Sequence, residues 1–218
     1  MKTDIFLMVQ RFNPFLDRKK IKLKSLIFTA VFIVFLSSIS FANPFENVLI
    51  ISIDALHPKA LGQKTSTNIY TLMEKGSYTL NGNSTTPPLT LLSHTAMFTG
   101  LEPSESGKTD NVWQQGQKRV TKKTIFNTTK SLGFSTGFFY SKEKLGFLVN
   151  EAVDLHKLSY DFSIEQAIEF FKNPEKNFCF LHISGLDYAG PTEGWMSPGY
   201  MEELFFIDET LKPLIALI

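Results

Sequence analysis

The sequence has little cysteine: Cys179 is the single one among 218 residues. A lone cysteine excludes an internal disulfide framework and a cysteine-rich metal site. An excess of charge is also missing, since the formal net charge is +1. Seven of the 22 basic and two of the 21 acidic side chains lie within residues 1–42, so the remainder has 15 basic and 19 acidic side chains, a net charge of −4. This mildly acidic body lacks the basic surface that binds nucleic acid, and we expect no nucleic-acid polymer as a partner.

Internal repeats and low-complexity linkers are absent as well. The composition, 43% hydrophobic and 20% charged, is typical of a globular protein with enough apolar mass for one core. We therefore expect one domain, or part of one, over residues 43–218.

Residues 1–42 are typical of an export signal. A basic segment, residues 18–24, precedes an apolar run over residues 26–36, and small residues then stand at Ser40 and Ala42. This order favours export to the periplasm or the extracellular space, with cleavage after Ala42. The apolar stretch over residues 26–42 approaches the ~20 residues of a membrane-spanning helix, so an uncleaved membrane anchor is the alternative.

The body alternates between strand and helix patterns. Residues 47–53 form a continuous apolar run that is typical of a strand buried on both faces of a parallel sheet. The patterns predict further strands over residues 136–140 and 178–183, and helices over 67–75, 122–132 and 163–171 and from Pro198 towards Leu211. This order predicts an α/β fold with a mainly parallel sheet and helices on both faces.

Several helix ends have recognisable signals. We expect Gly76, Gly100 and Gly133 to close helices, Gly76 in the left-handed conformation. Ser163 and Gln166 have the spacing of a capping box. Pro213 is expected to break the last helix. The end of the chain is apolar and would have nothing after it to pack against; the apolar residues are Leu211, Leu214, Ile215, Leu217 and Ile218. We expect Phe205 and Phe206 to belong to the same buried surface.

Three polar residues indicate a site at one edge of the sheet. Asp54 ends the first strand and Asp187 follows the last one, and ligands of open α/β sheets bind outside the carboxyl ends of the strands. Thr90 is expected at the start of a helix, where backbone N–H groups favour an anion such as phosphate. Its hydroxyl becomes a good nucleophile only with a base or a metal, which Asp54 would supply. The alternative is that the acids are turn or cap residues, Thr90 a plain cap and His94 a histidine packed against the sheet.

Five segments follow one another in a distinctive order: residues 51–56, 90–103, 110–113, 141–145 and 187–200. Together they resemble the alkaline phosphatase superfamily, and most closely its type I phosphodiesterase and nucleotide pyrophosphatase branch. The resemblance covers about residues 46–212. It implies an alkaline phosphatase-like fold and a small-molecule phosphate ester as substrate. Sulfate esters are disfavoured, because the segment at Thr90 has neither the aldehyde precursor nor the arginine of sulfatases.

The resemblance also implies roles for individual residues. Thr90 would be the metal-bound nucleophile that forms a covalent phospho-enzyme, which water then hydrolyses. Asp54 would bind the same metal as Thr90, Asp187 would bind a second metal, and Ser93 would lie near the phosphate oxygens. The implied cofactor is a divalent metal, with two zinc ions in an intact domain.

The sequence departs from the family at expected metal ligands. Pro191 and Ser106 stand where relatives have histidines, and a further Asp-His pair and histidine would come after Ile218. The chain is therefore expected to be the amino-terminal part of a truncated domain. Besides the phosphodiesterase, an inactive remnant that binds phosphate and a membrane-anchored transferase stay open. The sequence does not place any of the four histidines as a substitute ligand: His57, His94, His156 and His182.

Overall fold

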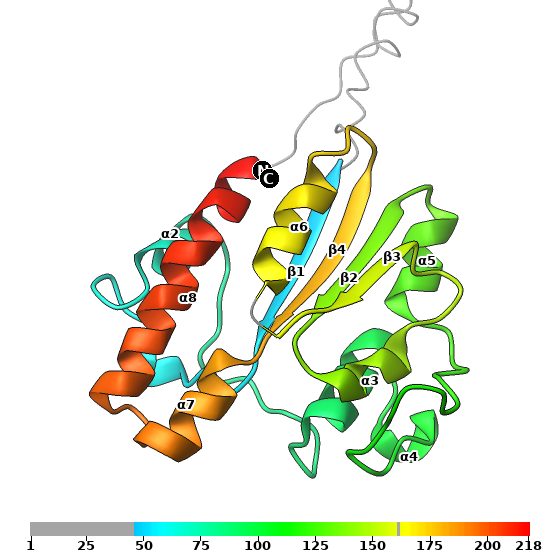
Figure 1. Cartoon of the computed structure of the whole chain (residues 1–218), viewed down its shortest axis with the longest axis horizontal. Helices are drawn as coiled ribbons and strands as arrows, with labels where there is room; N and C mark the ends of the chain where they lie inside the picture. The colour runs from blue at the N-terminus through cyan, green and yellow to red at the C-terminus, as the bar shows by residue number, and fades with distance from the viewer. Residues whose placement is uncertain (1–45, 161) are drawn as a thin grey trace, which may run out of the picture. The chain divides into compact units, whose positions relative to one another are not determined.

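The computed structural model describes residues 46–160 and 162–218, so the expectations for residues 1–42 lie outside it. Four strands form one parallel sheet in the order β1-β4-β2-β3 (Figure 1). They are β1 (Asn47–Ile53), β2 (Ser135–Tyr140), β3 (Leu155–Leu158) and β4 (Asn177–Ile183). The three predicted strands are therefore confirmed within one residue of their bounds, and β3 is an addition.

Five α-helices lie close to the positions that the sequence indicates, and the helices over residues 103–106 and 185–193 are additions. The α-helices are α2 (Thr67–Lys75), α3 (Thr90–Thr99), α4 (Pro103–Ser106), α5 (Ile125–Ser131), α6 (Ser163–Phe171), α7 (Gly185–Glu193) and α8 (Pro198–Leu217). Two short 3-10 helices, η1 (Pro58–Ala60) and η2 (Glu143–Leu148), follow β1 and β2. The structure thus has the alternation of strand and helix that favours a parallel sheet.

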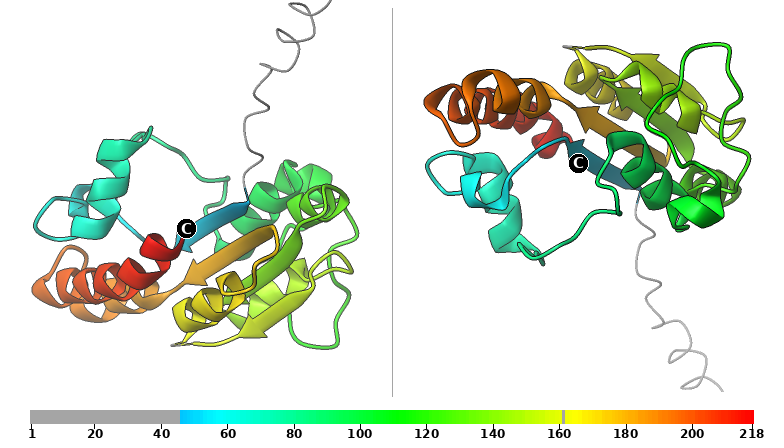
Figure 2. Two further views of the ribbon diagram at one scale, coloured as in Figure 1. Left: turned by 90° about the horizontal axis from the view of Figure 1, so that it is seen from above. Right: turned by 90° about the horizontal axis from the view of Figure 1, so that it is seen from below.

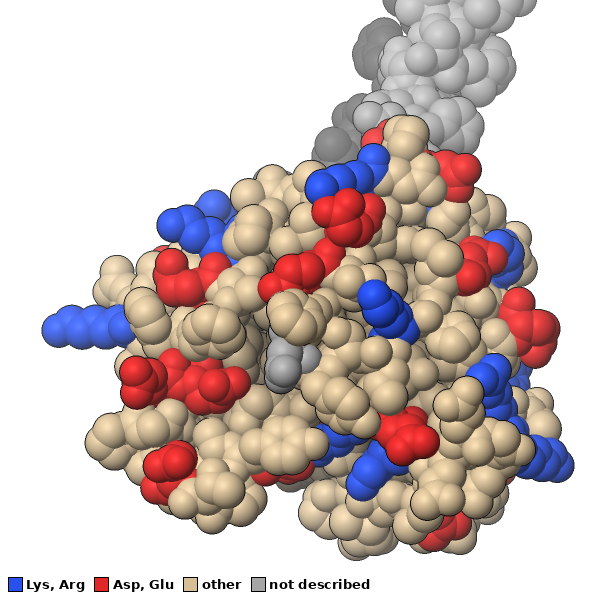
Figure 3. Space-filling view, in the orientation of Figure 1, with Lys and Arg blue, Asp and Glu red and all other residues tan. Residues whose placement is uncertain are grey.

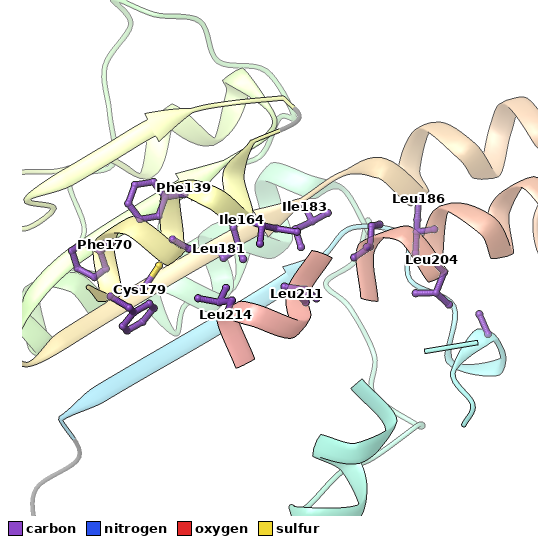
Figure 4. Packing of buried hydrophobic residues seen from close by; sticks show 14 of the residues in the cluster. Phe139, Ile164, Phe170, Cys179, Leu181, Ile183, Leu186, Leu204, Leu211 and Leu214 are labelled. Carbon is purple, nitrogen blue, oxygen red and sulfur yellow. The ribbon is translucent and has the colours of Figure 1, made fainter. Parts of the chain in front are cut away.

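Helices cover both faces of the sheet (Figures 1 and 2). Alternate strand residues point to opposite faces. On one face, Cys179 and Leu181 of β4 pack against α6 and α8. Leu211 and Leu214 of α8 belong to the same buried cluster (Figure 4). Phe178 and the other phenylalanines of the opposite face pack with α3 and α5. The predicted α/β class with helices on both faces is confirmed.

The expectation for β1 needs a correction. Every residue of β1 is only half-buried, whereas every residue of β4 is buried. The strand order explains the difference, because β4 lies between β1 and β2 while β1 ends the described sheet. A continuous apolar run identifies a strand of a parallel sheet, but it does not identify the central one.

Two helix-end predictions are wrong. Gly76 closes α2 in an extended conformation, with φ −125°, whereas Gly100 and Gly133 have φ of 69° and 82° in the left-handed region. Ser163 is the first residue of α6, and the residue before it makes no side-chain capping bond. Ser163 is itself buried, so its side chain belongs to the core side of the helix start.

The last helix is longer than predicted. α8 continues through Pro213 to Leu217, and both Leu211 and Leu214 are fully buried. These leucines share one face of the helix with Leu204 and Ile207, following the helical period. Phe205 and Phe206 lie off that stripe and are 52% and 65% exposed, so their expected burial is wrong.

The surface carries both signs of charge. On the face shown in Figure 3, Lys and Arg side chains alternate with Asp and Glu and form no continuous basic strip. Among the helices that the structure describes, none is both long enough and apolar enough to span a membrane.

Candidate functional site

Asp54 lies at the carboxyl end of β1, as the sequence indicates. Its backbone N–H donates to the carbonyl of Ile183, the last residue of β4, at 2.8 Å. The next residue, Ala55, has φ 64°, a left-handed conformation that costs an alanine about 1 kcal/mol. Tyr200 of α8 holds this turn, because its hydroxyl donates to the Ala55 carbonyl at 2.7 Å and accepts from the His57 N–H at 2.9 Å.

Thr90 is the first residue of α3, and its side chain meets Asp54. The Thr90 hydroxyl donates to Asp54 Oδ2 at 3.0 Å. The N–H of Leu91 is bonded to the side-chain oxygen of Asn111 at 2.9 Å, which satisfies one of the free N–H groups of the helix start. The structure therefore brings two of the predicted site residues together from positions 36 residues apart in sequence.

Lys142 connects these residues to Asp187. It directly precedes η2, and its ammonium nitrogen lies 2.5 Å from Asp54 Oδ2 and 2.5 Å from Asp187 Oδ2. The same nitrogen lies 3.4 Å from Thr90 Oγ1. The Lys142 side chain is only 9% exposed. Asp187 itself lies in the first turn of α7, so all three predicted metal ligands surround one lysine.

The charges of this cluster stabilise one another. Burial opposes ionisation of Asp54, but the neighbouring His182 and the Lys142 ammonium outweigh it, and the pKa of Asp54 lies well below its usual range. Burial likewise opposes the charge of Lys142, yet its bonds to Asp187 and Asp54 raise its pKa above the ordinary value. Both side chains are thus charged at neutral pH.

Two buried histidines lie behind the cluster. Burial, together with the neighbouring His182, lowers the pKa of His94 from 6.5 to about 4, and burial also lowers the pKa of His182. His94 bonds to Ser52 Oγ at 2.9 Å and to the Thr90 carbonyl at 2.7 Å. Its interpretation as a histidine packed against the sheet agrees with these contacts. His182 Nε2 lies 3.6 Å from Asp54 Oδ2 and is buried, with no hydrogen-bond partner among the residues that the structure describes.

Ser93 lies one turn after Thr90 on α3. Its hydroxyl shares hydrogen bonds with Ser84 Oγ at 2.8 Å and Thr85 Oγ1 at 2.9 Å. These contacts tie the segment before α3 to the helix. A contact of Ser93 with phosphate oxygens stays a prediction.

A pocket of about 490 Å³ opens beside the cluster. Lys142 and Asp187 line it, together with aromatic side chains that include Trp113, Tyr160 and Tyr188. The pocket therefore combines charged groups at the cluster with aromatic walls, which is suited to a small polar ligand that carries an apolar group.

The described donors do not form a metal site on their own. Within residues 46–160 and 162–218, no group of three or more His, Cys, Asp or Glu side chains is arranged to hold a metal ion. Asp54 and Asp187 instead share the Lys142 ammonium. The implied pair of zinc ions therefore does not fit the described residues.

Sequence reasoning missed Lys142 and His182. Lys142 lies within the segment at residues 141–145 that resembles the family. The sequence around this lysine does not indicate that Asp54 and Asp187 are its ion-pair partners. His182 stands in a strand, where a histidine is indistinguishable from a plain core residue until β4 and β1 are paired.

The chain has a match among protein families. The family model for type I phosphodiesterase / nucleotide pyrophosphatase matches residues 48–218. A comparison with curated protein sequences gives no match.

Solved structures share the fold. Murine ectonucleotide pyrophosphatase / phosphodiesterase 5 has a TM-score of 0.63 at 18% identity, over 78% of this chain and 51% of that one. Its inactive threonine-to-alanine variant in complex with AMP has a TM-score of 0.61 at 17% identity, over 78% and 51%. Phosphonoacetate hydrolase from Sinorhizobium meliloti 1021 has a TM-score of 0.61 at 13% identity, over 80% and 54%. The C-terminal periplasmic domain of EptC from Escherichia coli, in complex with Zn, has a TM-score of 0.53 at 12% identity, over 81% and 60%.

At these identities the likeness shows the fold alone. The chain spans about half the length of the mouse structures that it matches.

Proposed function

Because the chain belongs to the type I phosphodiesterase / nucleotide pyrophosphatase family, we propose that it hydrolyses phosphoric esters of small molecules at Thr90. The observation that carries this proposal is the hydrogen bond from the Thr90 hydroxyl to Asp54 Oδ2 at 3.0 Å, at the first residue of α3. A helix N-terminus favours an anion through its free N–H groups and its dipole. A phosphoryl group bound there would lie next to the threonine oxygen.

Two relatives support this choice of chemistry. The mouse structure with AMP is of a variant described as inactive, in which a threonine is replaced by alanine. The Sinorhizobium enzyme is a phosphonoacetate hydrolase. A catalytic threonine and a small phosphorus-containing substrate are therefore the expectations for this chain.

The step assigned to Thr90 is an in-line displacement. A bond forms between Thr90 Oγ1 and phosphorus while the ester P–O bond breaks, and the threonine proton passes to the Asp54 oxygen that it already contacts. The leaving oxygen takes its proton from water. A water molecule then attacks phosphorus and the bond from phosphorus to Thr90 Oγ1 breaks, which releases phosphate or a phosphate monoester. Thr90 Oγ1 takes back the proton held by Asp54, and the proton lost by the attacking water passes to solvent. The Lys142 ammonium, 3.4 Å from Thr90 Oγ1, stabilises negative charge that develops on that oxygen.

A second function is favoured by the electrostatics of Asp54. Its low pKa makes this carboxylate a poor proton acceptor, so Thr90 is oriented but weakly activated. Metal dependence fits the family, yet the described donors do not form a metal site. The alternative is therefore a protein that binds phosphate esters without turning them over.

The test compares Thr90→Ala with a matched threonine variant on the purified full chain. Hydrolysis of an aryl phosphodiester with a coloured leaving group is measured with added zinc and with a chelator. We expect Thr90→Ala to lose at least about a hundredfold in rate, because it removes the attacking atom. Thr128→Ala, which makes the same change at an exposed position of α5, should retain the wild-type rate.

Each outcome separates the candidates. Equal rates for Thr90→Ala and wild type would exclude Thr90 as the nucleophile. Binding of phenyl phosphate by calorimetry, without turnover in either metal condition, would favour the binding protein instead.

We also propose that residues 1–42 export the chain. The supporting observations are the basic and apolar order of this segment and the relative described as a periplasmic domain. Amino-terminal sequencing of the exported protein tests this, with Asn43 as the expected first residue and Met1 as the result expected of an uncleaved anchor.

A further inference from the structure

We propose that the Lys142 ammonium is a tethered cation that takes the place of a metal ion between Asp54 and Asp187. The inference rests on the proposed function only for the choice of site. It concerns how the two carboxylates are neutralised, and metal binding and unfolding can test it without any turnover.

The contacts of Lys142 are those of a bound cation. Its nitrogen has three N–H donors and three oxygen neighbours, namely Asp54 Oδ2 and Asp187 Oδ2 at 2.5 Å and Thr90 Oγ1 at 3.4 Å. One charged atom therefore gathers the three oxygens that the family resemblance implies as metal ligands. Hydrogen bonds between an ammonium and carboxylates are among the strong ones in proteins. The Lys142 side chain is 9% exposed, whereas its partners Asp54 and Asp187 are 17% and 40% exposed.

The charge balance favours the lysine over an added ion. Among the residues that the structure describes, the ion pairs of Asp54 and Asp187 with lysine both go to Lys142. The imidazole beside Asp54 belongs to His182, whose Nε2 lies 3.6 Å from Asp54 Oδ2. A divalent ion at the same place would meet the ammonium as a like charge within a few ångströms, where repulsion is strong.

The helix that carries Asp187 lacks a second ligand on the same face. The residue one turn later is Pro191, which lies inside α7 and has no donor atom in its side chain. A metal ion held by Asp187 would thus gain no further ligand from the next turn of α7. An ammonium needs no such ligand, because its tether fixes its position.

The tether is firmly anchored. The preceding residue, Ser141, is buried, and its hydroxyl bonds to His182 Nδ1 at 2.9 Å and to the His182 carbonyl at 3.2 Å. These bonds join the end of β2 to β4. The backbone of Lys142 is therefore placed by the sheet itself, and the side chain needs little ordering to reach the two carboxylates.

The experiment measures zinc binding and thermal unfolding of the full chain, for wild type and Lys142→Met. The wild type should have the same unfolding temperature with zinc and with a chelator. Lys142→Met should unfold at a lower temperature in chelator, since two carboxylates lose their counter-ion, and zinc should restore at least half of the loss. Its zinc affinity should exceed that of wild type by at least about tenfold, because the competing charge is gone.

Two further variants keep the test decisive. Lys144→Met removes a lysine two residues away that lines the same pocket, and it should behave as wild type. Lys142→Arg keeps the positive charge. This variant should therefore bind zinc no more tightly than wild type does, and zinc should not raise the unfolding temperature of the variant. The proposal is overturned if wild type and Lys142→Met bind zinc equally, or if Lys142→Arg gains zinc affinity as the methionine variant does. Should the methionine variant not fold even with zinc, the rescue has failed and the proposal is also overturned.

Discussion

Tyr200 offers a sharp test of how α8 positions the site. The side chain is fully buried, and its hydroxyl bridges the Ala55 carbonyl and the His57 N–H in the turn that follows Asp54. Tyr200→Phe keeps the ring in the core and removes only the oxygen. Two backbone groups then lose their partner, and each buried group left unpaired costs about 1–3 kcal/mol. Since the turn is partly solvated, we expect a total loss of about 2–4 kcal/mol.

Urea unfolding of wild type and Tyr200→Phe measures this loss. Tyr78→Phe is the matched control, because Tyr78 is 63% exposed and its variant should lie within about 0.5 kcal/mol of wild type. Tyr200→Phe should also slow any hydrolysis at Thr90, since the turn that it loosens holds the carboxylate bonded to that hydroxyl. A stability of Tyr200→Phe within 0.5 kcal/mol of the control would refute the anchoring of this turn by α8.

The fold was predictable because its signals are local. The strand patterns at residues 136–140 and 178–183 each need only a few neighbouring residues to be recognised, and the helix starts at Thr67 and Pro198 are marked by nearby residues. Burial was less predictable, because it depends on strand order. β1 has the same apolar pattern as a central strand, yet it ends the described sheet and is half-buried.

The end of α8 shows where a local rule fails. Proline removes one helical hydrogen bond, which predicts a break at Pro213. The helix nevertheless continues, with Leu211 and Leu214 buried on either side of that residue. Burial of a leucine contributes about 1.5–3 kcal/mol, which is comparable to the cost of the proline. Such a balance can be judged only once the partner surface of the helix is known.

The site was predictable in part. Asp54 and Thr90 follow from their places at a strand end and a helix start, and the structure brings them to 3.0 Å. Lys142 could not be found in this way, because it lies 88 residues from Asp54 and 45 from Asp187. Its position between them depends on β2 lying next to β4, a pairing between strands that are distant in sequence.

Two stability predictions concern other buried polar groups. The Asp208 carboxylate accepts hydrogen bonds from the backbone N–H groups of Asn68 and Ile69 at the start of α2, both at 2.9 Å. Asp208→Asn should therefore lower the free energy of unfolding in urea by about 2–3 kcal/mol. Glu209→Gln, at an exposed position, should change it little. Burial lowers the pKa of His94 from 6.5 to about 4, so between these pH values only the unfolded chain binds this proton. The free energy of unfolding should therefore decrease as the pH is lowered from 6.5 to 4, by on the order of 3 kcal/mol. His94→Gln should remove that part of the loss between pH 7 and pH 4, and an equal loss in both proteins would contradict it.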